Sequence, residues 1–173
     1  GYVEVPPWLP TGVTPVNYAL NWGAFDAGNV MAVHAVHVSD EDILALRNRN
    51  VAIGHCPRTN SSLGMGIAPL NEYLKAGLRI GLGTDSPAAT EAGDIFAEMR
   101  TGMQLQRATS PQNFLVSDTM LEMGTIGGAN VLGLADSIGS LEVGKKADVI
   151  AVDLSSSHSI PTKNPIAAVV NTA

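Results

Sequence analysis

Apolar positions in the first part of the chain follow two periods, and each period predicts one kind of element. Short, nearly continuous apolar runs at residues 30–38, 51–54 and 78–82 are typical of strands buried on both faces. Around these runs, apolar residues spaced three or four positions apart predict amphipathic helices. The predicted helices cover residues 14–23, 39–46, 67–77, 94–107 and 117–134, the last broken around Gly127-Gly128.

The order of these predicted elements indicates the fold class. Helix and strand alternate regularly as far as residue 85, with connections of only a few residues. Such alternation implies parallel strands joined by right-handed crossovers, because a helix carries the chain back to the start of the next strand. We therefore predict an α/β fold.

The pattern changes after Ser140. A turn-rich stretch at 141–146 leads into an apolar run at 149–152, and residues 166–173 also resemble a strand. We place a domain boundary near Ser140, between α/β alternation and β structure. The chain begins at Gly1 without a Met and ends on a predicted strand without a partner, so we expect it to belong to a longer protein.

Composition and charge exclude several classes of protein. The chain has 173 residues, 45% hydrophobic and 15% charged, which argues against intrinsic disorder. Its 10 Lys and Arg against 16 Asp and Glu give a net charge of −6, so nucleic acid is a poor partner and a small neutral or cationic substrate is a better one. No apolar run is long enough to span a membrane. The single Cys56 forms no internal disulfide, which fits a reducing, cytoplasmic location.

Ionisable residues follow each of the predicted strands. In parallel α/β barrels the reactive side chains project from the carboxyl ends of the strands. His34 lies late in the first strand, His55 follows the second and Asp85 follows the third, so all are expected at one rim. His37 has the opposite strand parity to His34 and is expected to face the surrounding helices. His158, in a Ser-rich stretch, is expected to be solvated.

Each candidate also has a purely structural interpretation. His34 could be a core histidine, and Asp85 could cap the next helix or orient a loop. His55 could anchor a loop or line a pocket, and Pro57 is expected to bar a helix there and force a turn. Cys56 could act as a thiolate nucleophile, but nothing in the sequence lowers the pKa of its thiol.

Several ordered motifs resemble the amidohydrolase superfamily. The branch they resemble contains methylthioadenosine/S-adenosylhomocysteine deaminases, cytosine and guanine deaminases and triazine hydrolases. The motifs are VHAVH at 33–37, SDE at 39–41, HCPRTN at 55–60, LGMGIAP at 63–69, GTD at 83–85, FAEMR at 96–100 and GSLEVGKKAD at 139–148. The resemblance implies that residues 1–139 form the C-terminal part of a (β/α)8 barrel and residues 140–173 return into a small β-sandwich domain.

The resemblance also implies roles for individual residues. Asp85 would bind a divalent metal, zinc first and iron as the alternative, and accept the proton of the metal-bound water. His34 would contact that water and the tetrahedral intermediate. Apart from the resemblance, we predict that His55 and Ser86 bind substrate. The family's remaining ligands, a His-x-His pair and a further His followed by a substrate-binding Glu, are not found in this sequence.

These residue types suit the implied chemistry. A divalent metal lowers the pKa of bound water from about 15.7 to about 7, which generates hydroxide at neutral pH. Hydroxide attacks an electrophilic ring carbon, and a carboxylate collects the proton and passes it to the leaving group. A nearby metal cation favours the charged form of Asp85.

The resemblance leaves three functional interpretations open. The first is a metal-dependent hydrolase that deaminates an amino-substituted nitrogen heterocycle, above all an adenosine-type compound. The second is a chlorohydrolase or another amidohydrolase of the same branch. The third is a non-catalytic module or fragment. We expect the isolated chain to be inactive and to bind metal weakly, its open sheet edges to favour association, and the full-length protein to form a homo-oligomer.

Overall fold

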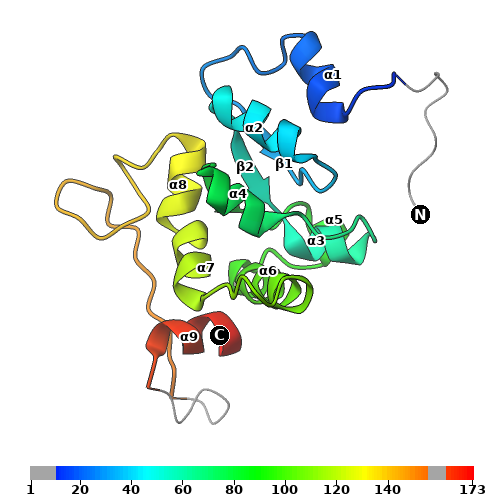
Figure 1. Cartoon of the computed structure of the whole chain (residues 1–173). Coiled ribbons are helices and arrows are strands. Elements are labelled where there is room, and N and C mark those ends of the chain that lie inside the picture. The colour runs from blue at the N-terminus through cyan, green and yellow to red at the C-terminus, as the bar shows by residue number, and fades with distance from the viewer. Residues whose placement is uncertain (1–10, 156–162) are drawn as a thin grey trace.

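A computed structural model describes residues 11–155 and 163–173 and shows a small parallel sheet surrounded by helices (Figure 1). The strands are β1 (Met31–Val33), β2 (Ala52–His55) and β3 (Ile80–Leu82). The helices are α1 (Pro15–Asn21), α2 (Asp40–Asn48), α3 (Pro57–Ser62), α4 (Leu70–Ala76), α5 (Pro87–Thr90), α6 (Ile95–Thr109), α7 (Ser117–Gly124), α8 (Ile126–Leu132) and α9 (Pro165–Thr172).

The three strands pair in parallel in the order β1-β2-β3. In the register, Ala32 of β1 lies opposite Ile53 of β2, which lies opposite Ile80 of β3. Helix α2 connects the first pair of strands, and α3 and α4 connect the second. This arrangement confirms the predicted α/β fold, and the parallel direction places the carboxyl ends of all three strands on one edge.

The helix ends follow from local sequence. Ser39 and Asp42 form a capping box at the start of α2, in which each side chain accepts a hydrogen bond from the other's backbone N–H. The Thr14 side chain caps α1 by accepting from the Asn17 N–H, and Pro15 is the first helical residue. Gly77 ends α4 with φ of 72°, the left-handed conformation that glycine adopts without strain.

The two faces of the sheet have different surroundings. Ile53 and Ile80 face a buried core whose other large members come from α4, α6 and α7, namely Leu70, Tyr73, Met99, Met103 and Met120. Residues of opposite parity, such as Val33, Gly54 and Gly81, line a cavity of about 270 Å³ with Val131 of α8. Helices α4, α6 and α7 therefore cover one face, while α8 covers only part of the other face and leaves a cavity there.

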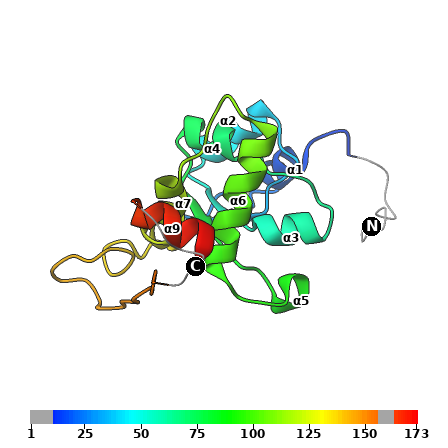
Figure 2. The ribbon, with the colours of Figure 1, turned by 90° about the horizontal axis from the view of Figure 1, so that it is seen from below.

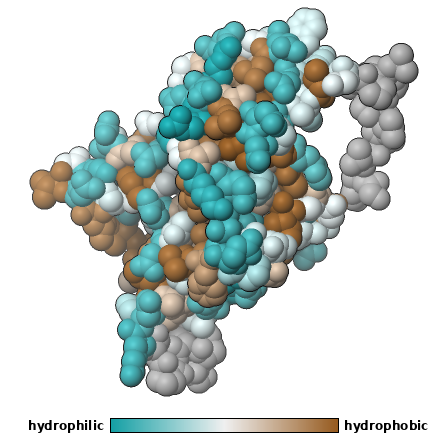
Figure 3. Space-filling model, viewed as in Figure 1, coloured by the Kyte–Doolittle hydropathy of each residue, from teal (hydrophilic) through white to brown (hydrophobic). Residues whose placement is uncertain are grey.

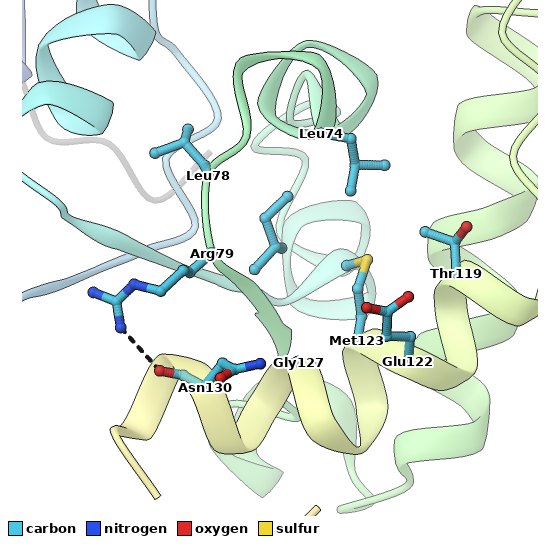
Figure 4. A pocket seen from close by; sticks show the side chains of 9 residues that line it. Leu74, Leu78, Arg79, Thr119, Glu122, Met123, Gly127 and Asn130 are labelled. Carbon is cyan, nitrogen blue, oxygen red and sulfur yellow. Dashed lines mark hydrogen bonds between the residues drawn. The ribbon is translucent and has the colours of Figure 1, made fainter. Parts of the chain in front are cut away.

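A second cavity, of about 220 Å³, lies at the amino end of β3 (Figure 4). Arg79, directly before β3, crosses this region and donates from Nη1 to the Asn130 carbonyl at 2.9 Å and from Nη2 to the Asn50 carbonyl at 2.7 Å. This is the opposite end of the strand from Asp85. Because the bottom of a barrel generally serves stability rather than chemistry, we interpret these bonds as joining α8 to the sheet.

The structure corrects several sequence predictions beyond residue 140. Residues 149–152 lie in an extended segment without strand pairing, and residues 166–173 belong mostly to helix α9. Asn164 caps this helix by accepting from the Ala167 N–H, and Pro165 is its first residue, so local capping outweighs the β-branched content. Several large apolar residues beyond residue 140 are exposed, among them Leu141 and Ile150, and Figure 3 shows apolar surface interspersed with polar surface over the molecule. The sandwich domain stays a prediction, and His158 lies outside the described residues.

Smaller differences concern the ends of elements. The first strand ends at Val33 rather than at residue 38, because His34 and Ala35 adopt positive φ values that a strand does not allow. Pro57 begins helix α3 instead of preventing one, since proline lacks only an N–H that the first helical turn leaves unpaired. The break in the 117–134 helix falls at Thr125. None of the described helices combines the length and apolar character needed to cross a bilayer.

The contact between α8 and β3 gives a test of this packing. A Cβ added to Gly127 would lie 2.8 Å from the Ile80 carbonyl oxygen, whereas one added to Gly128 would meet nothing closer than the Met123 carbonyl oxygen at 3.5 Å. Gly127→Ala is therefore expected to lower the free energy of unfolding by about 1–3 kcal/mol through overpacking against backbone. Gly128→Ala is the matched control and should be neutral or stabilising because alanine favours helix. Chemical denaturation of both variants would measure this, and equal effects would contradict the packing.

Candidate active site

His34 and Asp85 meet at the carboxyl edge of the sheet. His34 directly follows β1, and Asp85 follows β3 after Gly83 and Thr84. The His34 Nε2 atom lies 3.6 Å from Asp85 Oδ2, and the two side chains are 27% and 28% exposed. The structure therefore brings together two residues that are distant in sequence, at a position reachable from solvent.

Both residues adopt a backbone conformation that is uncommon outside glycine. The φ angle is 67° at His34, 43° at Ala35 and 57° at Asp85. Left-handed backbone at non-glycine residues costs of order 1–3 kcal/mol each and occurs preferentially at functional sites. Here it turns the chain sharply as it leaves the strand, and the side chains of His34 and Asp85 face each other.

Asn60 holds the His34 ring from behind. The His34 Nδ1 atom lies 2.9 Å from Asn60 Oδ1, and Asn60 is buried on α3. With the amide oxygen accepting, Nδ1 carries the proton and Nε2 of the neutral ring presents its lone pair toward Asp85. An acceptor facing a carboxylate is favourable only when a proton or a donor group lies between them, which makes the pair a candidate for handling a proton.

Asp85 is oriented by the residue after it. The Ser86 N–H donates to Asp85 Oδ1 at 2.6 Å, and the Ser86 side chain caps α5 by accepting from the Ala88 N–H at 3.2 Å. Ser86 is exposed at the same rim. Its predicted contact with substrate stays a prediction, while its contact with Asp85 is a finding that the sequence did not indicate.

His55, the last residue of β2, is buried in the core rather than exposed at the rim. The residue is 2% exposed, and its side chain packs against α6. A Cβ atom added to Gly102 of that helix would lie 3.6 Å from the His55 Nε2 atom. Burial, together with the nearby His34, lowers the pKa of His55 to about 4, so the ring is neutral at pH 7. Strand parity with Ile53 could have indicated this orientation from the sequence. A role for His55 in binding substrate stays a prediction.

Cys56 and Asp85 both line the 270 Å³ cavity on the open face of the sheet. Burial, Asp85 and Glu98 together raise the pKa of the Cys56 thiol to about 11. A thiol with a raised pKa stays protonated at neutral pH and is a poor nucleophile. The cavity is lined mostly by apolar groups, and Asp85 is the charged residue among its described lining.

The described residues alone do not complete a metal site. Within residues 11–155 and 163–173, no three His, Cys, Asp or Glu side chains gather closely enough to hold an ion. A zinc site takes four ligands, whereas the pair described above offers one carboxylate and one adjacent imidazole.

The comparisons with known proteins agree with this fold. The sequence model of the amidohydrolase family matches residues 11–173, and the chain belongs to this family. A 5-methylthioadenosine/S-adenosylhomocysteine deaminase of Desulforudis audaxviator is 42% identical over 94% of this chain and 38% of its own length. The deaminase of the same name from Moorella thermoacetica is 38% identical over the same shares. The chain thus spans well under half the length of these relatives.

Solved structures show the same relationship. An adenosine deaminase from Xanthomonas campestris with bound zinc superposes with a TM-score of 0.86 at 32% identity, covering 92% of this chain and 36% of the other. An atrazine chlorohydrolase from Arthrobacter aurescens complexed with zinc superposes with a TM-score of 0.85 at 29% identity, over the same shares. The described part of this chain therefore corresponds to a portion of larger hydrolases, and its α/β fold is part of a barrel.

The buried His55 gives a prediction for stability against pH. Its folded pKa of about 4 lies below the ordinary value of 6.5, so the unfolded chain binds more protons as the pH falls. The free energy of unfolding is expected to drop by about 2 kcal/mol from His55 between about pH 7 and about pH 5.

His55→Leu should remove this part of the pH dependence in urea titrations at both pH values. His37→Gln, which changes an exposed histidine, should retain the wild-type dependence. An unchanged slope in His55→Leu would show that the ring is not buried in its neutral form.

Proposed function

We propose that the protein to which this chain contributes hydrolyses an amino-substituted nitrogen heterocycle and releases ammonia, with an adenosine-type compound as the first candidate. The observation that carries the proposal is the pairing of His34 with Asp85 at the carboxyl edge of a parallel sheet, beside a largely apolar cavity. The names of the deaminase relatives support the substrate class. A cytoplasmic location and a homo-oligomeric assembly stay predictions.

The residues of the chain supply proton handling for such a reaction. Water that attacks the ring carbon must lose a proton, and the amino group must gain one to leave as ammonia. The Asp85 carboxylate is exposed enough to accept the first proton and to return it to the departing nitrogen. His34, held by Asn60 at Nδ1, presents Nε2 to the same space. When protonated, it can donate to negative charge developing on the attacking oxygen.

We also propose that the full-length protein binds a divalent metal at this site. Imidazole and carboxylate ligands favour zinc, with iron as the alternative, and zinc is bound in two of the similar structures. Asp85 is the ligand that this chain would contribute. The further ligands would come from outside the described residues, and the bound metal would supply an activated water.

Activity of the full-length protein tests the role of Asp85. The product of the complete reading frame should release ammonia from a panel of aminopurines, aminopyrimidines and triazines. Asp85→Asn should lower kcat by about 10²–10⁴-fold, the usual contribution of a general acid–base group. Asp26→Asn, which alters a surface carboxylate paired with Arg49, should leave kcat unchanged.

The same assay separates the alternatives. Release of chloride but not ammonia from chlorinated triazines would favour the chlorohydrolase interpretation. Complete inactivity of the metal-loaded, folded, full-length protein across the panel would support a non-catalytic module and contradict the proposal.

Metal content of the 173-residue chain is a separate test. Because the described residues offer fewer than four ligands, the purified chain is expected to retain well under one zinc per molecule after dialysis. Elemental analysis by mass spectrometry would measure this, with the full-length protein as the positive control. Tight stoichiometric zinc in the short chain would show that it completes a site by itself.

A further inference from the structure

The segment that carries Asp85 and Ser86 depends on contacts from elsewhere in the chain for its position. Residues 85–88 and 91–94 are exposed. Helix α5, at Pro87–Thr90 in this segment, is a single helical turn. Figure 2 shows α5 projecting away from the other helices. Exposed loops with little secondary structure open locally with low free energy unless side chains secure them.

Arg58 secures this segment from α3. Its Nη2 atom donates to the Thr90 carbonyl at 2.8 Å, and its Nη1 atom donates to the Ala92 carbonyl at 3.2 Å. The two carbonyls lie on either side of Glu91, which has a φ of 62°. A planar guanidinium can bridge two acceptors in this way, and a lysine ammonium cannot reproduce the geometry.

Thr90 extends the connection toward the candidate site. It is buried, and its hydroxyl lies 3.4 Å from the Thr84 carbonyl and 3.2 Å from the Ala92 carbonyl. Thr84 directly precedes Asp85. The contacts of Arg58 therefore reach, through one buried side chain, the residue next to the carboxylate that faces His34.

Glu98 on α6 fixes Arg58 in turn. Its Oε2 atom accepts from the Arg58 backbone N–H at 3.0 Å, and its Oε1 atom lies 3.8 Å from Arg58 Nη1. The Glu98 side chain has no exposed surface, and Oε1 has no hydrogen-bond partner in the described part of the chain. A buried acid–base pair often contributes little to stability compared with apolar residues of the same size, so its presence here calls for another role.

We infer that the Arg58–Glu98 pair is a positioning device for the segment of residues 84–94. The pair keeps Asp85 directed at His34 and keeps Ser86 at the rim. Arg58 and Glu98 are positioning residues, because neither lies between Asp85 and His34. As far as it concerns catalysis, this inference rests on the proposed function, but the ordering of the segment is a property of the chain itself.

Amide hydrogen exchange on the 173-residue chain tests the ordering independently of activity. Arg58→Met removes both hydrogen bonds to the segment, so exchange of the amides in residues 86–92 should accelerate by about tenfold or more. Amides of β2 and β3 should change far less. Arg49→Met, at a surface ion pair with Asp26, is the matched control and should leave the segment unaffected.

Arg58→Lys covers the case in which Arg58→Met does not fold. It keeps a positive charge near Glu98 but loses one of the two carbonyl contacts, so exchange in the segment should lie between the wild-type and Met values. Unchanged exchange in the segment in either folded variant would overturn the inference.

Kinetics of the full-length protein separate positioning from a purely structural role. Arg58→Met should displace Asp85 and so lower kcat by about ten- to a hundredfold, with a smaller effect on KM. Arg58→Lys should recover part of the loss. Loss of activity in Arg58→Met without faster amide exchange in residues 86–92 would overturn the inference. If the wild-type full-length protein has no hydrolase activity but Arg58→Met still exchanges faster, the proposed function is refuted and the ordering role is supported.

Discussion

The parallel pairing of β1, β2 and β3 is the constraint on which the candidate site depends. Because the strands run in one direction, the residues that follow them leave the sheet at the same edge. This direction brings His34 and Asp85 to within 3.6 Å. The left-handed backbone at both positions persists because the paired strands before them and the buried Asn60 behind His34 hold the chain on either side.

Several polar side chains are buried near the carboxyl edge of the sheet. Burying them lowers stability, but their contacts fix the positions of neighbouring residues. His55, Asn60 and Glu98 are all almost fully buried, and each has a polar side-chain atom without a partner in the described part of the chain. Burial raises the pKa of Glu98, which the N–H and guanidinium of Arg58 partly oppose. Such groups are retained where they fix one arrangement of neighbouring residues. Of these groups, Asn60 contacts His34 and Glu98 contacts Arg58, so each holds a neighbouring residue in place.

The chain also shows how a site can be divided between parts of a larger fold. It contributes the adjacent His34 and Asp85 side chains and an apolar cavity, and it spans 38% of the length of the two deaminase relatives. The open face of the sheet exposes Met31 and Val33, as expected of strands that would be enclosed in a complete barrel.

The sequence by itself determined the α/β class, the caps Thr14, Ser39 and Gly77 of three helices, and the candidacy of His34 and Asp85, because periodicity and capping are local properties. It misjudged residues 166–173, where a cap and a proline outweighed β-branched content. Only the tertiary structure decided that His34 and Asp85 lie 3.6 Å apart, that Asn60 contacts the His34 ring, and that Arg58 contacts Glu98. These contacts join separate elements, and their energies depend on burial and distance, which no local pattern encodes.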